Sequence, residues 1–181
     1  MLSYIFSPLN FTNYDAIICK RGRFILAALL FILTVLSYMK ITKEFVLMIF
    51  SDVKLIIWDL DDTLWQGTLM NNDTLVLRDE FVAYIKETLR QGVAHSICSK
   101  NDFAPAKAHI CSLGLWELFV LPSINWDEKG LRVKNIIEQL QLSPKDALFI
   151  DDNVSNLEDA NRCCNGLRTF TPEAFLDVIH K

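Results

Sequence analysis

The stretch VKLIIWDLDDT, residues 53–63, decides the fold that we predict for this chain. Its first six residues are apolar except for Lys54 and include three β-branched side chains, which is typical of a buried strand. The apolar run stops at Asp59, and Asp61 and Asp62 follow at once. We therefore expect a strand whose carboxyl end carries a group of carboxylates.

A second apolar strand is followed by carboxylates in the same way. The sequence FIDDN places Asp151 and Asp152 directly after a predicted strand at residues 147–150. If the two strands are neighbours in a parallel sheet, their carboxylates crowd one crevice, where like charges resist ionising together unless a cation neutralises them. Hard oxygen ligands of this kind suit Mg²⁺. One acidic turn could merely cap a helix, but two such turns indicate a metal site that handles phosphate.

Predicted strands and helices alternate along the chain from residue 53 onward. The strands are predicted at residues 53–58, 93–98, 117–121, 147–150 and 167–170. The helices are predicted at residues 78–91, 103–112, 130–141 and 154–164, with a last helix from Pro172 behind the N-cap Thr171. This alternation predicts an α/β fold, a doubly wound, Rossmann-like parallel sheet of about five strands with helices on both faces. Such sheets bind ligands at the carboxyl ends of their strands.

Two further polar residues could serve the same site. Ser99 follows the second predicted strand and could donate its hydroxyl to a phosphoryl oxygen, although it could also simply cap the next helix. Lys129 stands where the helix 130–141 begins and could neutralise both a phosphate and Asp59, although most lysines are only solvated. Either residue alone would be a weak signal.

These residues together resemble the motifs of the haloacid dehalogenase (HAD) superfamily. The run from Asp59 to Thr63 is similar to its D-x-D-x-T motif, and the matches to the second, third and fourth motifs are Ser99, Lys129, and Asp151-Asp152 with Asn156. The strings WDLDDTLWQG, ICSKND, INWDEKG and LFIDDN resemble subfamily IIIC, which includes FkbH-like and magnesium-dependent phosphatase-like proteins. Lys134 is a second candidate for the third motif. The resemblance covers residues 53–175.

The resemblance implies a role for each matching residue. Asp59 would be the nucleophile and Asp61 the general acid/base. The Mg²⁺ ligands would be the carboxylates of Asp59 and Asp152 and the backbone carbonyl of Asp61, with Asp151 supporting the ion through water. The residues implied to bind the phosphoryl group are Ser99, Lys129, Thr63 and Asn101. Thr63 would also brace its loop, and Asn156 would orient the fourth motif.

The implied reaction is Mg²⁺-dependent hydrolysis of a phosphate ester through an aspartyl-phosphate, on an unknown substrate. Only 35 residues separate Thr63 from Ser99, and the predicted helix 78–91 occupies many of them, so the cap is minimal and residues 64–77 form a small flap. An open site suits a phosphorylated small molecule or a protein-borne phosphate. Two alternatives stay open: glyceryl or acyl transfer from a phosphorylated donor to an acyl carrier protein, and a non-catalytic, membrane-tethered binding module.

The first 47 residues differ in character, so we divide the chain into an N-terminal extension, residues 1–47, and a HAD-like catalytic domain, residues 48–181. Residues 24–39 form an uncharged apolar run that predicts a helix about 24 Å long, a little short of the roughly 30 Å hydrocarbon core of a membrane. Three interpretations stay open. The run is a membrane anchor or uncleaved signal-like segment, or a buried helix, or it is not translated because Met39 or Met48 is the true start.

Composition excludes several classes of protein. The formal net charge is -4 at pH 7, which gives no electrostatic reason to expect nucleic acid as a partner. The five cysteines form no C-x-x-C pair, which argues against a zinc site and favours reduced thiols in a reducing compartment. We therefore expect a cytoplasmic catalytic domain, anchored to a membrane if residues 24–39 enter one.

Overall fold

The computed structural model of the protein describes Thr34, residues 52–71 and residues 73–180. Apart from Thr34, the apolar helix predicted over residues 24–39 lies outside this range, as does the boundary at residues 47–48, so both stay predictions. Within the described part of the chain, no helix combines the length and the hydropathy that crossing a membrane requires.

Five parallel strands form the main sheet in the order β5-β4-β1-β6-β7. The strands are β1 (Leu55–Trp58), β4 (Ala94–Ser99), β5 (Ser123–Ile124), β6 (Ala147–Ile150) and β7 (Arg168–Phe170). β1 is the central strand, and β6 is its neighbour in the register that aligns Trp58 with Ile150. The predicted Rossmann-like parallel sheet and the predicted adjacency of these two strands are confirmed.

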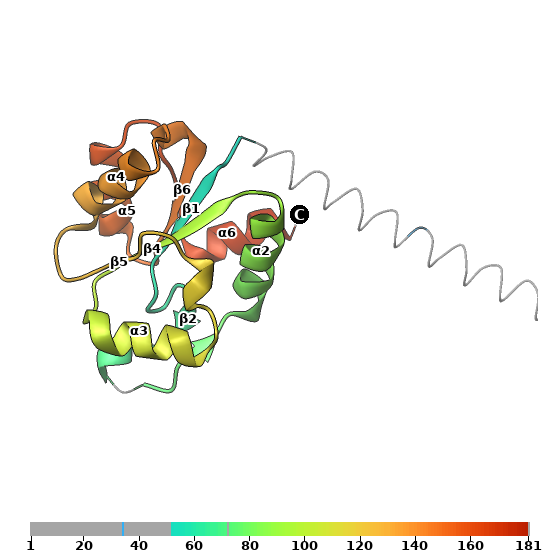
Figure 1. The fold of residues 1–181 in the computed structure, drawn as a ribbon, viewed down its shortest axis with the longest axis vertical. Helices are drawn as coiled ribbons and strands as arrows, with labels where there is room; N and C mark the ends of the chain where they lie inside the picture. The colour runs from blue at the N-terminus through green and yellow to red at the C-terminus, as the bar shows by residue number, and fades with distance from the viewer. Residues whose placement is uncertain (1–33, 35–51, 72, 181) are drawn as a thin grey trace, which may run out of the picture. The chain divides into compact units, whose positions relative to one another are not determined.

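Helices cover both faces of the sheet, as Figure 1 shows with α4 and α5 on one side of the strands and α2 and α6 on the other. The helices are α2 (Asp79–Arg90), α3 (Phe103–Ser112), α4 (Lys129–Gln139), α5 (Val154–Cys163) and α6 (Pro172–Ile179). Because side chains alternate along a strand, β1 sends Ile56 and Trp58 into the core shared with α2, α3 and α6. Its other two residues, Leu55 and Ile57, pack in the core shared with α4 and α5.

The insertion between β1 and β4 is small. The flap, residues 64–77, forms a two-stranded antiparallel hairpin of β2 (Trp65–Gln66) and β3 (Val76–Leu77), with one turn of 3₁₀ helix, η1 (Leu69–Asn71), between them. Asn72 lies outside the described residues. The helix α2 follows directly, so the flap is the whole cap on this side of the sheet.

One predicted strand was wrong. Residues 117–121 were expected to form the third strand, stopped by Pro122, but the structure has a 3₁₀ turn, η2 (Trp116–Leu118), and places β5 after the proline. Phe119 is buried in the core, yet Leu121 is exposed and its backbone φ is +47°, which an extended strand does not allow. The apolar run therefore anchors a loop, and Pro122, which has no N–H to donate, fits directly before the strand.

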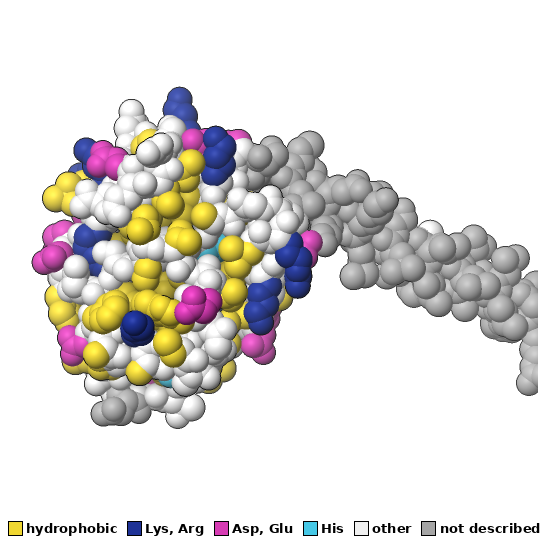
Figure 2. All heavy atoms as spheres, viewed as in Figure 1, with side chains coloured by type: hydrophobic (Ala, Val, Ile, Leu, Met, Phe, Trp, Pro, Cys, Tyr) yellow, Lys and Arg dark blue, Asp and Glu magenta, His cyan; other side chains and the backbone are white. Residues whose placement is uncertain are grey.

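The helix α3 lies beneath an exposed apolar surface. Figure 2 shows apolar side chains gathered over the region of α3, with basic and acidic side chains among them. Phe103 of α3 is 47% exposed, and the Lys107 ammonium stands 5.6 Å from the centre of its ring and 4.9 Å from that of Trp116. These cation–π contacts keep the charge of Lys107 close to the apolar surface.

His95 is a buried polar residue of the core, on β4 between Trp58 and α2. The Trp58 indole Nε1 donates to His95 Nδ1 at 2.9 Å, and His95 Nε2 lies 2.9 Å from Thr88 Oγ1. Because Thr88 Oγ1 donates to the Tyr84 carbonyl at 2.8 Å, the ring proton sits on Nε2 and is donated to Thr88. Burial lowers the pKa of His95 from 6.5 to about 3, so the folded protein holds the ring neutral.

We predict that His95 makes the fold sensitive to acid. Between pH 6.5 and about 3, the unfolded chain takes up a proton on His95 that the folded protein resists, so this stabilisation is complete above pH 6.5 and is lost as the pH falls. The loss is at most about 1.4 kcal/mol per pH unit. Urea denaturation of the wild type and of His95→Gln across this pH range measures the loss. All other titratable groups are present in both proteins, so the difference between the two curves isolates His95. The free energy of unfolding should fall more steeply in the wild type, and parallel curves would contradict the prediction.

Candidate active site

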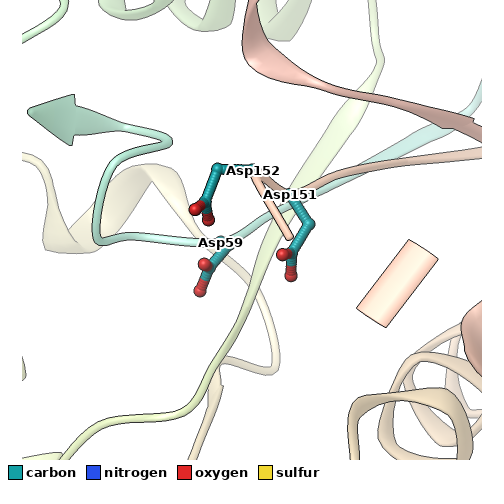
Figure 3. A group of neighbouring side chains, drawn as sticks. All are labelled: Asp59, Asp151 and Asp152. Carbon is teal, nitrogen blue, oxygen red and sulfur yellow. The ribbon is translucent and has the colours of Figure 1, made fainter. Parts of the chain in front are cut away.

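Three carboxylates meet at the carboxyl edge of the sheet. Asp59 follows β1 and the pair Asp151-Asp152 follows β6, and one oxygen from each of the three lies within 4.8 Å of the others. Figure 3 shows the three side chains side by side, drawn from two neighbouring segments of backbone. The backbone continues the ladder here, because the Asp59 amide donates to the Ile150 carbonyl at 2.9 Å. The pairing of β1 with β6 thus places the acidic turns face to face.

Asp59 is buried, with 5% of its surface exposed. One of its oxygens lies 2.7 Å from the Lys129 ammonium. Burial raises the pKa of Asp59 from 3.8 to about 6, with the charge of Asp151 adding to the rise, while Lys129 and the Ser99 hydroxyl oppose it. The side chain is therefore a carboxylate whose negative charge depends on nearby cations.

Lys129 supplies the positive charge of the site. It is the first residue of α4, only 1% exposed, and its ammonium lies 2.6 Å from Asp151 as well as 2.7 Å from Asp59. Burial disfavours the charge, but the two carboxylates outweigh it and raise the pKa of Lys129 above its usual range. Lys134, the other candidate, is exposed and pairs with Glu138 at 3.8 Å. The structure thus brings Lys129 to the carboxylates and leaves Lys134 on the surface of α4.

The two residues of the second acidic turn differ in their surroundings. Asp151 is fully buried, and besides Lys129 it accepts bonds from the Asn153 amide at 2.9 Å and from Asn156 Nδ2 at 3.0 Å. Asp152 is exposed, and its amide donates to Thr63 Oγ1 at 3.0 Å. Partial burial, together with the charge of Asp59, raises the pKa of Asp152. Asp151 is therefore fixed within the protein, whereas Asp152 presents its carboxylate to solvent.

A pocket of about 240 Å³ opens over these groups. Its lining consists of Asp59, Asp61, Asp62, Thr68, Ser99, Lys100, Lys129, Asp152, Asn153 and Asn156. Of the residues expected to bind phosphate, Ser99 and Lys129 line the pocket. Thr63 and Asn101 do not line it but contact residues that do: Thr63 Oγ1 accepts from the Asp152 amide, and Asn101 Nδ2 donates to Asp61 at 3.0 Å and to Ser99 Oγ at 3.3 Å. Direct phosphate binding by these two residues stays a prediction.

Arg132 was not expected from the sequence. It lies one turn after Lys129 and is 7% exposed. Its guanidinium donates to five oxygens, namely Ser123 Oγ, and the carbonyls of Ser99, Ser123, Asn125 and Asp127. A guanidinium has five N–H donors, so all of them are used. Arg132 therefore ties the end of β4, the strand β5 and the loop before α4 to the helix that carries Lys129.

The N-terminus of α4 is also fixed from α5. The Gly130 amide donates to Asp159 Oδ2 at 2.6 Å, which places a carboxylate at the positive end of the α4 dipole. A Cβ at residue 130 would lie 2.6 Å from Asp159 Oδ2 and 2.7 Å from the Asp159 carbonyl. Only glycine therefore allows this close approach. Neither Arg132 nor this helix contact has a local signature, because each depends on segments far apart in the sequence.

The fold matches that of several solved structures. The N-terminal part of a Bacteroides fragilis protein, containing a phosphatase domain complexed with Mg, is 23% identical with a TM-score of 0.60, and the match covers 71% of this chain and 39% of that one. The cobalt-bound deoxy-D-mannose-octulosonate 8-phosphate phosphatase from Haemophilus influenzae is 21% identical with a TM-score of 0.54, covering 67% and 70%. A HAD-superfamily hydrolase from Ehrlichia chaffeensis is 13% identical with a TM-score of 0.54, covering 71% and 95%.

These likenesses show the fold alone: the chain shares it with the Bacteroides phosphatase domain, the Haemophilus phosphatase and the Ehrlichia HAD-superfamily hydrolase. The chain spans less than half the length of the Bacteroides protein. No protein-family model matches the sequence, and no curated protein matches it.

We predict that Gly130→Ala destabilises the protein. An alanine inside a helix is normally better than glycine by roughly 0.5–1 kcal/mol, but here the added Cβ meets the backbone of Asp159. Overpacking of this kind costs about 1–3 kcal/mol, so the melting temperature should fall. Asn135→Ala, an exposed substitution on the same helix, is the matched control and should leave the melting temperature unchanged or raise it slightly, because alanine favours a helix. A Gly130→Ala protein more stable than the wild type would contradict the prediction, since it would mean that Asp159 can move away from residue 130 at little cost.

Proposed function

We propose that the protein is a Mg²⁺-dependent phosphohydrolase that forms an aspartyl-phosphate on Asp59. One observation carries the proposal: the Asp59 carboxylate directly follows the central strand and lines the pocket, 2.7 Å from the buried Lys129 ammonium and within 4.8 Å of an oxygen of Asp152. The proposed nucleophile, the lysine cation and the proposed metal-binding carboxylate therefore line the same pocket. The fold shared with phosphatases supports the same reaction, and the Bacteroides protein of that fold is a complex with Mg.

The carboxylates of the site fit Mg²⁺. Asp59 and Asp152 offer oxygens within 4.8 Å of one another, and hard oxygen donors that leave room for water and phosphate are what this ion prefers. The proposed ligands are these two carboxylates and the backbone carbonyl of Asp61, with Asp151 supporting them through water. Bound there, the ion would supply positive charge against the phosphate and the transition state.

The residues of the chain divide the reaction between them. The Asp59 carboxylate attacks phosphorus in line, and Lys129 offsets the repulsion between two negatively charged groups. The Ser99 hydroxyl lines the same pocket and would donate to a phosphoryl oxygen. Asp61 gives a proton to the leaving oxygen and then takes one from the water that hydrolyses the aspartyl-phosphate. Lys129 is already held against Asp59, so it needs no rearrangement to act.

The small size of the flap supports an open site, which could accept a bulky substrate or a phosphate on a protein surface. Among the described residues between β1 and α2, the regular elements are the hairpin β2–β3 and η1, which are too small to enclose a substrate. We therefore propose a phosphorylated small molecule or a protein-borne phosphate as the substrate. The strings shared with subfamily IIIC, among them WDLDDTLWQG and LFIDDN, favour membership of that subfamily.

We predict that Asp59→Asn abolishes turnover without unfolding the protein. The amide keeps the shape of the side chain but cannot attack phosphorus, so kcat on a phosphate ester should fall by on the order of a thousandfold or more. Mass spectrometry after rapid quenching should find a phosphate adduct on the wild type alone. Asp177→Asn makes the same chemical change on the exposed side of α6 and should leave kcat unchanged. An active, folded Asp59→Asn protein would disprove the nucleophile.

We predict a different effect for Asp152→Asn, because this residue is proposed to bind only the metal. Loss of one charged ligand should raise the Mg²⁺ concentration for half-maximal activity by roughly tenfold or more, because even residues that only hold a ligand in place are worth that much, while saturating Mg²⁺ recovers much of kcat. A magnesium titration of the steady-state rate measures the shift, with Asp177→Asn again as control. If the titration curves of Asp152→Asn and the wild type coincide, Asp152 is not a ligand.

A further inference from the structure

Asp61 is held by hydrogen bonds that the proposed reaction does not by itself explain. Its Oδ1 accepts from the Trp65 indole Nε1 at 2.9 Å and from the Leu69 amide at 3.1 Å. Its Oδ2 accepts from Asn101 Nδ2 at 3.0 Å. The donors come from two separate places in the fold, the flap and the segment between β4 and α3.

We infer that Trp65 and Asn101 are positioning residues for Asp61 and that they assign its transferable proton to Oδ2. This inference rests on the proposed function, in which Asp61 is the general acid/base. Each carboxylate oxygen has two in-plane lone pairs. Both lone pairs of Oδ1 are used by Trp65 and Leu69, whereas Oδ2 accepts a single bond from the part of the chain that the structure describes, so Oδ2 has one lone pair left for the proton.

The flap is braced so that it can hold Oδ1. Trp65 is fully buried and packs edge-on against His109 of α3, with ring centres 5.0 Å apart. The turn after it is tied back to the first acidic loop, because the Gly67 amide donates to Asp62 Oδ1 at 2.8 Å. The two donors to Oδ1, Trp65 and Leu69, therefore lie on either side of a fixed turn, and the position of the flap sets the orientation of Asp61.

Asn101 holds the other oxygen from the segment between β4 and α3. It is 1% exposed, and its Nδ2 also donates to Ser99 Oγ at 3.3 Å. Its own Oδ1 is buried without a hydrogen-bond partner among the described residues, which costs stability. An orphaned polar atom of this kind is typical of a side chain that is kept for its role at a site. The amide thus links the proposed acid/base to the proposed phosphate-binding hydroxyl.

The geometry has a specific consequence for the first half-reaction. As the bond from Asp59 to phosphorus forms and the bond from phosphorus to the leaving oxygen breaks, the proton passes from Asp61 Oδ2 to that oxygen. A phenolate with electron-withdrawing groups leaves without this proton, whereas an alkoxide needs it. Mispositioning of Asp61 should therefore slow the cleavage of alkyl phosphates and spare that of nitrophenyl phosphate.

The test compares two substrates across matched variants. Trp65→Phe removes the indole donor and keeps an aromatic ring, and Asn101→Ala removes the donor to Oδ2. The matched control is Trp58→Phe, because Trp58 is also fully buried but donates to His95 instead. The quantity measured is kcat/KM with Mg²⁺ for p-nitrophenyl phosphate and for glycerol phosphate, since it reports the step up to departure of the leaving group. Thermal denaturation of each variant reports its stability.

For Trp65→Phe and Asn101→Ala we expect kcat/KM to fall by roughly tenfold to a hundredfold on glycerol phosphate and to stay within about threefold on p-nitrophenyl phosphate. Trp58→Phe should lose stability and keep the wild-type ratio between the two substrates. Equal losses on both substrates, or none, in both Trp65→Phe and Asn101→Ala would overturn the inference.

Asp61→Asn separates the failure of this inference from that of the proposed function. If Asp61→Asn is selectively slow on glycerol phosphate and neither positioning variant is, the inference falls and the acid/base role stands. If Asp61→Asn shows no selectivity, the acid/base role itself is wrong and the inference falls with it.

Discussion

The contact on which the rest of this structure depends is the buried ammonium of Lys129 between the carboxylates of Asp59 and Asp151. Two carboxylates and one lysine leave a net negative charge in a place shielded from water, and such charges are costly unless they are fully paired. The exposed Asp152 adds a further carboxylate at the same edge. A second cation would neutralise the remaining charge. The excess of carboxylates over lysine at this edge therefore explains both the electrostatics of the folded chain and the metal-dependent chemistry proposed for it.

The folding of separate parts of the chain meets at this contact. Asp59 directly follows β1, Asp151 directly follows β6, and Lys129 is the first residue of α4. The register of β1 with β6 places the two carboxylates at one edge, and the approach of α4 to α5 through Gly130 and Asp159 sets where the lysine stands. The contact between Lys129 and the two carboxylates therefore depends both on the packing of the core and on polar contacts at the edge of the sheet.

Much of this arrangement could be predicted from the sequence, because it follows from local patterns. Short apolar runs before Asp59 and before Asp151 predicted the two neighbouring strands, and the chemistry of crowded carboxylates predicted a metal site. The loop at residues 117–121 could not be predicted in this way, since its apolar side chains read as a strand until the φ of Leu121 is known. Arg132 acts through partners on other segments, among them Ser99 and Ser123, and only the folded chain brings those partners within reach.

The saturated guanidinium of Arg132 has a mechanical consequence. The end of β4, the strand β5 and the loop before α4 all give carbonyl oxygens to one side chain, and that side chain grows from the helix that begins with Lys129. A displacement of any of these segments is passed to the others, because the planar guanidinium of Arg132 holds them all through five hydrogen bonds. The parts of the pocket wall that carry Ser99 and Lys129 should consequently move as one rigid body relative to the opposite wall.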